Sequence, residues 1–534
     1  MRKRSLLCLA LTFTLAGVMM LAGCGSSNET GEDPLKVKCH NGVMVGQEEN
    51  DVISFLGVPY AKPPTGDLRW RAPEAAEESD EEIICDEFGD TAIQYEWPTE
   101  PASYNEKSED CLTLNIWKGK DAAEGDAKAV MVWFHGGAYS WGGTSDPMYN
   151  GQNFVEAHPD VILVTCNYRL GIMAWADFTD IPGGEDYTDL NLGLRDSICA
   201  LEWIQENIGA FGGDADNVTI FGESAGAVTT GALIVSPAAQ GLFSKSIIHS
   251  TALDEESLGT IEDAKEFAAT MAEYAGCETM DEMLALSGDE WAELDTEYSL
   301  GDYSPGAIAD GEIVPEDYMS ALKEAGDSGI TMMIGTNADE SYYDPGELGG
   351  YDNWVEYLDE IWNEDYEAAD SEGKALMDEF EKIQKNDEGR NDVFTKAEYR
   401  NEKSWWISAI NMAETYSDGG GTAYMYYWDV PSTREDYLYG ACHAVELSYI
   451  FNNLDIDIYA GDNQDKPTAE KAQQAWMNFA ESGDPSIDEA EWLPYDAENR
   501  NTMIISLDGW KLESDPMSNL RKLMTELLDG HGIE

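Results

Sequence analysis

Basic residues are scarce in this sequence. Its 534 residues include 31 lysines and arginines against 105 aspartates and glutamates, which gives a formal net charge of −74 and an isoelectric point of about 4.1. Proteins that bind DNA, RNA or anionic membrane surfaces use clusters of lysine and arginine. The composition therefore argues against nucleic acid and bare membrane as partners. The negative field would concentrate cationic small molecules. We favour the interpretation that the charge serves only to keep an exposed protein in solution.

Cysteine is also sparse, with nine residues in the whole chain. Seven of them follow Cys24, at positions 39, 85, 111, 166, 199, 277 and 442. Small domains held together by disulfides have dense, even-numbered cysteines, and no pair here has the spacing of zinc ligands. The sequence thus excludes a disulfide framework, and we expect most of these thiols to be small buried hydrophobic groups.

The first 34 residues differ from the rest of the chain. Arg2, Lys3 and Arg4 precede an apolar run at 6–20, and Leu-Ala-Gly-Cys follows at 21–24. This pattern is typical of a bacterial lipoprotein signal peptide (1–23) that leaves Cys24 as a lipid-modified first residue. A plain signal peptide and an uncleaved membrane anchor are the alternatives.

Export would give the chain an extracytoplasmic location, with the membrane as partner only through the lipid at Cys24. Cleavage would remove three basic residues and no acidic ones, so the mature charge would be −74 − 3 = −77. The polar segment 24–34 would be a flexible tether, and 35–530 one large domain.

Strand and helix patterns alternate between residues 129 and 250. Apolar, β-branched runs predict strands at 129–134, 161–167, 218–222 and 245–250, and helical periodicity predicts helices at 192–208 and 225–234. Such alternation is typical of an α/β fold with a mostly parallel, doubly wound sheet. Two further strands are predicted at 331–335 and 422–428, and an amphipathic helix at 466–480.

Two acidic segments, 254–303 and 351–416, have helical patterns and few strand signals. We expect them to be helical insertions that cover the carboxyl edge of the sheet, where α/β folds bind their ligands.

Gly222-Glu223-Ser224-Ala225-Gly226 lies directly between a predicted strand and a predicted helix. This is the context that a G-x-S-x-G turn requires, since the glycines let the chain reverse and expose the serine hydroxyl. Ser224 is therefore a candidate nucleophile.

A serine nucleophile needs a base that is held by an acid. Of six histidines, only His443 lies in a predicted loop downstream of Ser224; His40 precedes the first strand, His249 ends a strand and His531 lies in the tail. The acid should fall between 224 and 443. Asp339 and Glu340 both follow the predicted strand 331–335, and position alone does not choose between them.

The negative oxygen that forms during acyl transfer needs N–H donors. His135-Gly136-Gly137-Ala138-Tyr139 follows the predicted strand 129–134, and adjacent small residues let backbone amides face a ligand. Gly137, Ala138 and Ala225, the residue after the nucleophile, are the candidate donors.

Several motifs in this order resemble type-B carboxylesterases, most closely the bacterial para-nitrobenzyl esterase branch, which is related to cholinesterases. The resemblance covers roughly 36–528. It is carried by EDCLTLNIW at 109–117, HGGAY at 135–139, NYRLG at 167–171, FGGD at 211–214, FGESAG at 221–226 and NFAESGDP at 478–485.

The resemblance implies the α/β-hydrolase fold and a catalytic triad of Ser224, His443 and Glu340, and so favours Glu340 over Asp339. It also implies that Gly137, Ala138 and Ala225 form the oxyanion hole. Glu223, Ser250 and Glu446 match positions of a supporting hydrogen-bond network in this family.

Some positions depart from the family. Ser341 and Thr251 stand where glycine is usual, and the usual disulfide partner of Cys111 is missing, so that Cys85 is a possible substitute. Trp97 lies where cholinesterases place an aromatic contact for a cation, and a core or rim tryptophan is the alternative that we favour.

These residues predict a serine hydrolase that cleaves carboxylic esters of small molecules through an acyl-serine, without a metal or organic cofactor. A non-catalytic, esterase-like adhesion protein is the competing hypothesis, and the complete triad argues against it. The same groups could also act on thioesters, amides, aryl esters or choline esters.

Overall fold

The computed structural model describes residues 33–94, 106–342, 351–386, 390–434, 439–455, 459–461 and 464–533. The chain divides into two units, Met1–Asp33 and Pro34–Glu534. The predicted signal peptide, Cys24 and Trp97 lie outside the described residues. No helix in the described part of the chain is both long enough and apolar enough to span a membrane.

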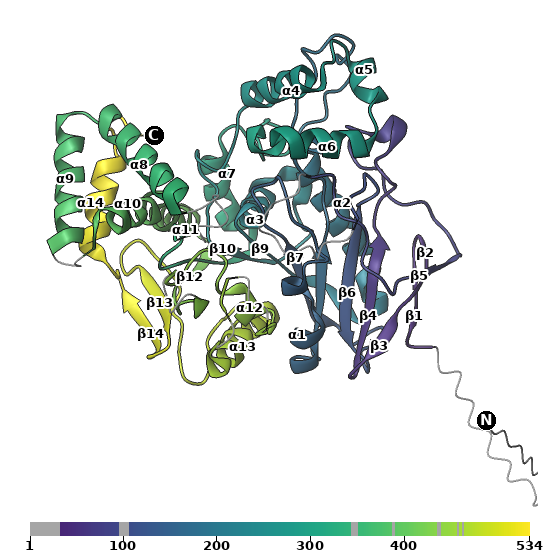
Figure 1. Ribbon diagram of the computed structural model, residues 1–534. Coiled ribbons are helices and arrows are strands. Elements are labelled where there is room, and N and C mark those ends of the chain that lie inside the picture. Colours follow the sequence, from purple (N-terminus) through teal and green to yellow (C-terminus); the bar gives the residue numbers. More distant parts are fainter. Residues whose placement is uncertain are drawn as a thin grey trace, which may run out of the picture. The chain divides into compact units, whose positions relative to one another are not determined.

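A large sheet forms the centre of the unit Pro34–Glu534 (Figure 1). Its order within the described residues is β14-β13-β12-β11-β10-β9-β7-β8-β6-β4-β3, and the strands from β13 to β8 are parallel. The strands are β3 Gln47–Glu49, β4 Val52–Pro59, β6 Thr113–Gly119, β7 Lys128–Phe134, β8 Val161–Cys166, β9 Gly213–Glu223, β10 Lys245–His249, β11 Thr331–Asn337, β12 Thr422–Asp429, β13 Asn501–Ser506 and β14 Gly509–Ser514. A separate small sheet contains β1 Lys36–Cys39, β2 Gly42–Val45 and β5 Glu82–Ile84.

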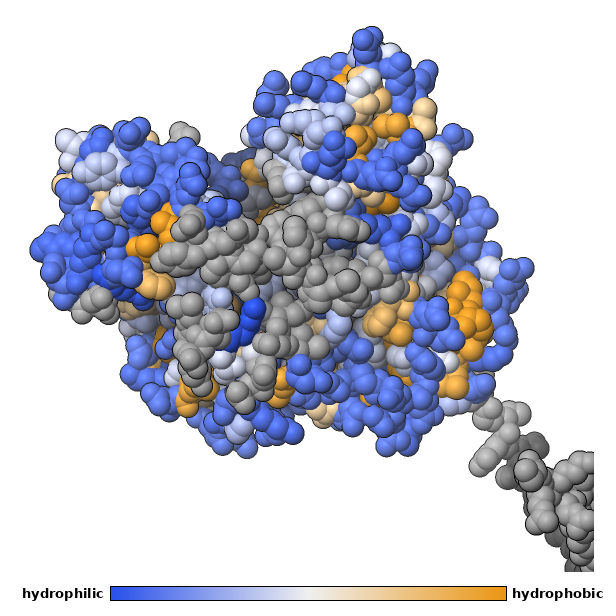
Figure 2. Space-filling model, viewed as in Figure 1, coloured by the Kyte–Doolittle hydropathy of each residue, from blue (hydrophilic) through white to orange (hydrophobic). Residues whose placement is uncertain are grey.

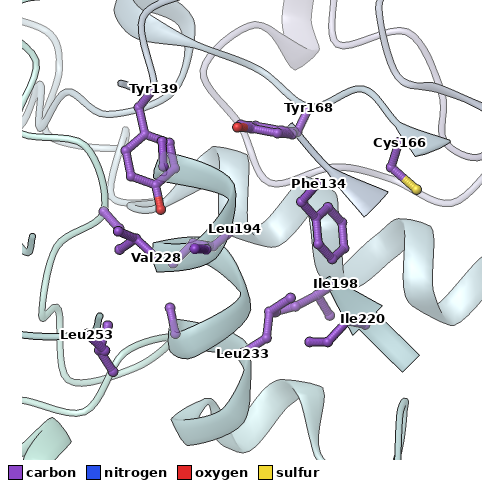
Figure 3. Packing of buried hydrophobic residues seen from close by; sticks show 14 of the residues in the cluster. Phe134, Tyr139, Cys166, Tyr168, Leu194, Ile198, Ile220, Val228, Leu233 and Leu253 are labelled. Carbon is purple, nitrogen blue, oxygen red and sulfur yellow. The ribbon is translucent and has the colours of Figure 1, made fainter. Parts of the chain in front are cut away.

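Helices cover both faces of the sheet. Alternate residues of a strand point to opposite faces, so Val132 and Phe134 of β7 pack in one core while Met131 and Trp133 pack in another. The first core contains α2 (Leu192–Asn207) and α3 (Ala225–Val235), and Figure 3 shows their side chains around Phe134. The second contains α1 (Gln152–Ala157), α12 (Leu447–Ile450) and α13 (Lys466–Ser482). The predicted doubly wound α/β fold is confirmed.

Two groups of helices are inserted between strands of the parallel sheet. The first lies between β10 and β11, and the second between β11 and β12; Figure 1 shows each as a separate cluster. The first group is α4 Ile261–Ala275, α5 Met280–Ala285, α6 Gly288–Tyr298 and α7 Tyr318–Ala325. The second is α8 Tyr351–Ala368, α9 Ser371–Asn386, α10 Asp392–Arg400, a π-helix at Asn401–Ile407 and α11 Ser408–Asp418. Helices α4 to α6 fall in the predicted insertion 254–303 and the second group in the predicted insertion 351–416, whereas α7 lies after the first predicted segment and was not predicted.

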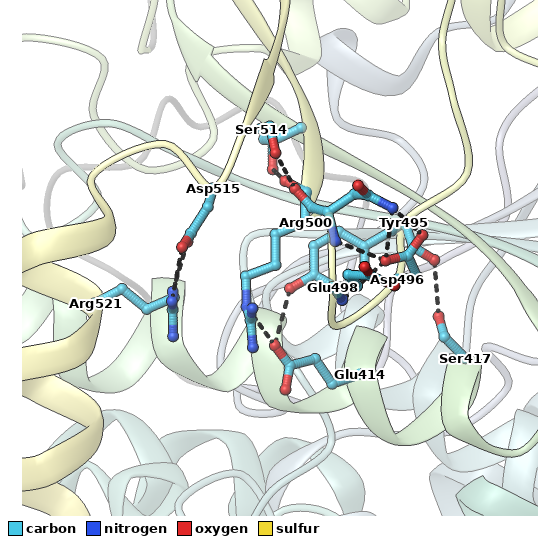
Figure 4. A network of polar contacts seen from close by, with 11 residues as sticks. Glu414, Ser417, Tyr495, Asp496, Glu498, Arg500, Ser514, Asp515 and Arg521 are labelled. Atoms are coloured by element: carbon cyan, nitrogen blue, oxygen red, sulfur yellow. Dashed lines mark hydrogen bonds and ion pairs between the residues drawn. The ribbon is translucent and has the colours of Figure 1, made fainter.

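The end of the chain is held against the second inserted group by ion pairs (Figure 4). Arg500 Nε lies 2.8 Å from Glu414 Oε1 on α11. Arg521, on α14 (Ser518–Leu528), donates from Nε to Asp515 Oδ1 over 2.6 Å. The first contact ties the start of β13 to the insertion that borders the candidate site described below, and the second holds the last helix against the end of β14.

Candidate active site

Ser224 stands on a sharp turn between β9 and α3. Its backbone is strained, with φ 55° and ψ −125°, which is a conformation that non-glycine residues rarely adopt. The turn is possible because both flanking glycines lack a Cβ: one at Gly226 would lie 2.0 Å from the carbonyl oxygen of Phe134, and one at Gly222 would lie 2.2 Å from the carbonyl oxygen of Gly226. The Ser224 amide donates to the His249 carbonyl over 3.1 Å. The chain thus holds the hydroxyl-bearing residue at the start of a helix, where developing negative charge is stabilised.

Glu340 and His443 are in direct contact. Oε2 of Glu340 lies 2.7 Å from Nδ1 of His443, and Oε1 accepts a hydrogen bond of 2.6 Å from the amide of Asn337, at the end of β11. Glu340 is fully buried. Asp339 faces elsewhere, because its Oδ2 accepts from the Ala441 amide over 2.9 Å. Of the two candidate acids, Glu340 is therefore the one that can orient the imidazole.

The other ring nitrogen of His443 faces a second carboxylate. Oε1 of Glu223 lies 2.9 Å from Nε2. Burial raises the pKa of the Glu223 carboxyl. Burial alone would lower the pKa of His443, but the charges and hydrogen bonds of Glu223 and Glu340 outweigh it and hold that pKa well above 6.5. The sequence placed Glu223 in a supporting network and did not predict this contact with the base.

The loop after β7 packs against the serine turn. Gly137, Ala138 and Tyr139 have positive φ values of 105°, 52° and 61°, so three successive residues turn the chain back on itself. A Cβ at Gly136 would lie 2.7 Å from Oε2 of Glu223 and 3.1 Å from Cβ of Ser224. Only a loop of very small residues can approach the nucleophile this closely.

A cavity of about 210 Å³ lies over Ser224. Ala138 and Ala225, two of the three predicted oxyanion donors, line it together with the nucleophile. The remaining wall comes largely from the inserted segments, at Asp254, Glu256, Ser257, Ser304, Pro305, Gly306, Arg400, Ser404 and Trp405. The prediction that the insertions cover the active-site edge is thereby confirmed.

Trp405 is a site residue that the sequence did not reveal. Its ring centroid lies 4.8 Å from that of His443, and it also lines the cavity. It belongs to the π-helix, whose wide turn has no recognisable sequence signal; such turns are frequent at functional sites.

The three predicted supporting residues lie close behind the triad. Glu446 is fully buried, and its Oε2 accepts from Nδ2 of Asn337 over 2.6 Å. Glu223 contacts His443 as described. The amide of Ser250 donates to the Gly335 carbonyl over 2.8 Å, while its hydroxyl makes no hydrogen bond with any described residue.

The structure also shows the environment of the possible Cys85–Cys111 disulfide and of the two positions that depart from the family pattern. Cys85 and Cys111 are both buried, unpaired thiols, so they form no disulfide. Of the two departures from the family pattern, Thr251 lines the cavity, whereas the Ser341 amide is bound by Asn401 Oδ1 at 2.6 Å.

Two histidines were misplaced by the sequence reasoning. His40 follows the first strand, β1, because that short strand was not recognised. His531 is not in a frayed tail, since its Nδ1 lies 3.2 Å from Oδ1 of Asp370. Within the described residues, no group of three or more His, Cys, Asp or Glu side chains is arranged to hold a metal ion.

Comparison with known proteins identifies the family. The model of the carboxylesterase family matches residues 33–520. The para-nitrobenzyl esterase of Bacillus subtilis is 32% identical over 506 residues, covering 90% of this chain and 96% of the relative, and the pig liver carboxylesterase is 29% identical over 487 residues, covering 84% of each chain.

Solved structures agree. A carboxylesterase of Geobacillus stearothermophilus superposes with a TM-score of 0.78 at 30% identity, covering 92% of this chain and 100% of the other. A thermophilic para-nitrobenzyl esterase gives a TM-score of 0.76 at 29% identity, with the same coverage. The chain therefore belongs to the carboxylesterase family: it is a serine hydrolase of carboxylic esters with the α/β-hydrolase fold.

Proposed function

We propose that Ser224, His443 and Glu340 form the catalytic triad, and that Gly137, Ala138 and Ala225 supply the oxyanion donors. The observation that carries the proposal is the 2.7 Å contact between Glu340 and His443, beside a strained serine turn that opens into a cavity. A base that is oriented by a carboxylate next to an exposed serine is the arrangement that activates a hydroxyl for acyl transfer.

The reaction has two halves. Ser224 Oγ attacks the ester carbonyl carbon while Nε2 of His443 takes its proton, and backbone amides stabilise the oxyanion. Collapse of the tetrahedral intermediate breaks the bond to the alcohol, which leaves with the proton from His443. Water then attacks the acyl-serine, giving its proton to His443, and the acid is released as Ser224 Oγ recovers a proton.

Glu223 has a part in this cycle. Its carboxylate faces Nε2 at 2.9 Å, so in the resting enzyme it stabilises the protonated imidazole. His443 becomes a base only after it has lost this proton. Glu223 thus sets the pH at which the base becomes available and stabilises the imidazolium that forms during attack.

The test uses an organophosphate ester with a para-nitrophenolate leaving group. The enzyme should release one equivalent of para-nitrophenolate and lose activity, and peptide mass spectrometry should locate the phosphoryl group on Ser224. Ser224→Ala should release none, and its turnover of a para-nitrophenyl ester should fall on the order of a thousandfold or more with an unchanged circular dichroism spectrum. A phosphoryl group on another residue, or turnover by the folded variant, would contradict the triad.

We also propose that the protein is an exported bacterial lipoprotein, anchored to the extracytoplasmic face of a membrane through Cys24. The support is the basic and apolar leader that ends in Leu-Ala-Gly-Cys at 21–24, followed by a polar tether. Mass spectrometry of the mature protein should find an N-terminal cysteine that carries acyl chains. An unmodified Cys24, or an N-terminus elsewhere, would indicate free secretion or retention of the leader.

A further inference from the structure

His249 lies behind the triad, at the end of β10, and has no part in the mechanism given above. Its side chain is completely buried among aromatic rings, with centroids 5.7 Å from Trp476 and 5.9 Å from Tyr426. Both ring nitrogens nevertheless have polar partners. Three specific partners therefore hold this buried ring in one orientation and select one tautomer.

The partner of Nε2 fixes the tautomer. The indole Nε1 of Trp476 donates to Nε2 of His249 over 3.2 Å. An indole N–H can only donate, so Nε2 must present its lone pair and the ring proton must be on Nδ1. A second proton on Nε2 would set two donors against each other. Trp476 therefore selects the tautomer of His249 in which Nδ1 is the donor.

That Nδ1–H faces two acceptors, Glu446 and the Tyr426 hydroxyl. Oε1 of Glu446 lies 3.3 Å away and the hydroxyl of Tyr426 lies 3.0 Å away. Glu446 is fully buried beside two other carboxylates, Glu223 and Glu340. Burial would raise the pKa of Glu446, but the hydrogen bonds from His249 and Asn337 outweigh burial and lower it.

Asn337 connects Glu446 to the catalytic pair. Its Nδ2 donates to Glu446 Oε2 over 2.6 Å and to the carbonyl of Cys442, the residue before His443, over 3.0 Å. Its backbone amide donates to Oε1 of Glu340 over 2.6 Å. Asn337 therefore holds the proposed catalytic acid through its backbone amide, and its side chain joins Glu446 to the start of the loop that carries the base.

We infer that His249 is a positioning residue of this esterase: locked as the Nδ1–H tautomer by Trp476, it holds Glu446, which through Asn337 holds Glu340 against His443. The inference rests on the proposed triad. Loss of the Nδ1 donor leaves a buried carboxylate short of one partner, so Asn337 loses a fixed acceptor and the contact between Glu340 and His443 loosens. Turnover should therefore fall, whereas substrate binding in the cavity on the other side of the triad should stay unchanged.

The test compares two amides at position 249. The side-chain nitrogen of asparagine can take the place of Nδ1, whereas the oxygen of glutamine can take the place of Nε2 and leaves the Nδ1 place without a donor. His249→Gln should lower kcat about 10- to 100-fold with little change in KM, the range seen when partners behind a catalytic group are removed. It should also move the acid limb of the pH profile of kcat/KM, because Glu223, Glu340 and Glu446 all face the base or its acid. His249→Asn should restore most of the turnover.

Four further variants make the outcome decisive. If His249 acts through Glu446, the double variant H249Q/E446Q should be no slower than E446Q alone. His158→Asn removes a half-buried imidazole that also contacts α13, at Gln473, and should leave kcat unchanged. Glu340→Gln tests the triad itself.

Equal effects of glutamine and asparagine at 249, or additive effects in the double variant, would overturn the inference and make His249 a packing residue. An unchanged kcat in H249Q with a crippled E340Q would overturn the inference alone. A fully active E340Q would overturn the proposed triad.

Discussion

At the scale of single residues, the site is defined by one imidazole between two carboxylates. His443 must be neutral to accept the serine proton, and Glu223 and Glu340 hold its pKa well above 6.5. The value of kcat/KM should therefore rise with pH, with a midpoint above that of an ordinary histidine.

Glu223→Gln should move this midpoint to lower pH by about one unit, because one of the two negative charges that stabilise the imidazolium is gone. Its plateau should fall about tenfold, since the same charge is missing when the imidazolium forms during attack. A pH–rate profile of both enzymes measures the shift. A midpoint that stays in place would show that Glu223 is protonated in the free enzyme.

Substitution of the neighbouring acids Glu340 and Asp339 should have unequal effects on turnover. Glu340→Gln should reduce kcat by about three orders of magnitude, because the imidazolium loses its partner. Asp339→Asn should be mild, since an amide oxygen can still accept from the Ala441 amide. Steady-state kinetics of the two variants, with thermal melting as the control for folding, decides between them, and greater sensitivity at Asp339 would reverse the assignment of the acid.

Sequence reasoning proposed Ser224 and His443 from their places after strands, but it did not separate Glu340 from Asp339 without a family resemblance. Both follow the same strand, and with 105 acids in the chain composition carries no information. The contact of Glu223 with His443 joins positions 220 residues apart and depends on the folded loops. Sequence reasoning excluded His249 as the base because it ends a strand. That position is correct, but the partners of its side chain come from three distant elements and could not be predicted.

At the scale of elements, the serine turn depends on how closely α3 approaches β7. Gly226→Ala should destabilise the protein by a few kcal/mol or displace Ser224, because the new Cβ would lie 2.0 Å from a backbone oxygen that cannot move aside. Gly231, on the same helix, is the matched control: its Cβ would meet side-chain atoms at 3.2 Å, and alanine is the better helix former by about 1 kcal/mol.

Thermal melting and turnover of both glycine variants measure this difference. Gly231→Ala should melt and turn over close to wild type, while Gly226→Ala should lose activity. Equal behaviour of the two would mean that the turn tolerates a backbone shift.

The parallel strands β7 to β12 were predicted because buried β-branched runs between helices are distinctive, whereas β13, which pairs in parallel with β12, was missed. The start of β9 was also missed: the strand begins at Gly213 and not at 218, in a stretch where Asp214, Asp216 and Asn217 are polar and the pairing with β7 shifts register. The antiparallel strands β4 and β6 were not predicted, because short buried runs outside an alternating pattern cannot be told from buried helix by periodicity.

At the scale of the whole molecule, the excess of acidic residues gives the protein no electrostatic attraction to anionic membranes. The lipid at Cys24 is therefore the single proposed means of membrane attachment. Figure 2 shows a face covered largely by hydrophilic residues, and the expected mature charge of −77 repels anionic lipid. Cys24→Ser should therefore release active enzyme into the soluble fraction or leave it unprocessed, with kcat/KM unchanged. Fractionation and activity assays measure this, and a variant that is processed yet stays with the membrane would point to another anchor.

The catalytic side chains are also spread along the chain, from position 224 to position 443, and each follows a different strand of the parallel sheet. Neighbouring parallel strands can pair only after a long connection has been closed, which makes such sheets slow to assemble, whereas helices form from local contacts. Enzyme diluted from denaturant should consequently recover its helical circular dichroism before it recovers turnover. The delay between the two signals would measure how long the last strand pairing takes. Recovery of ester hydrolysis would then report when the sheet is complete.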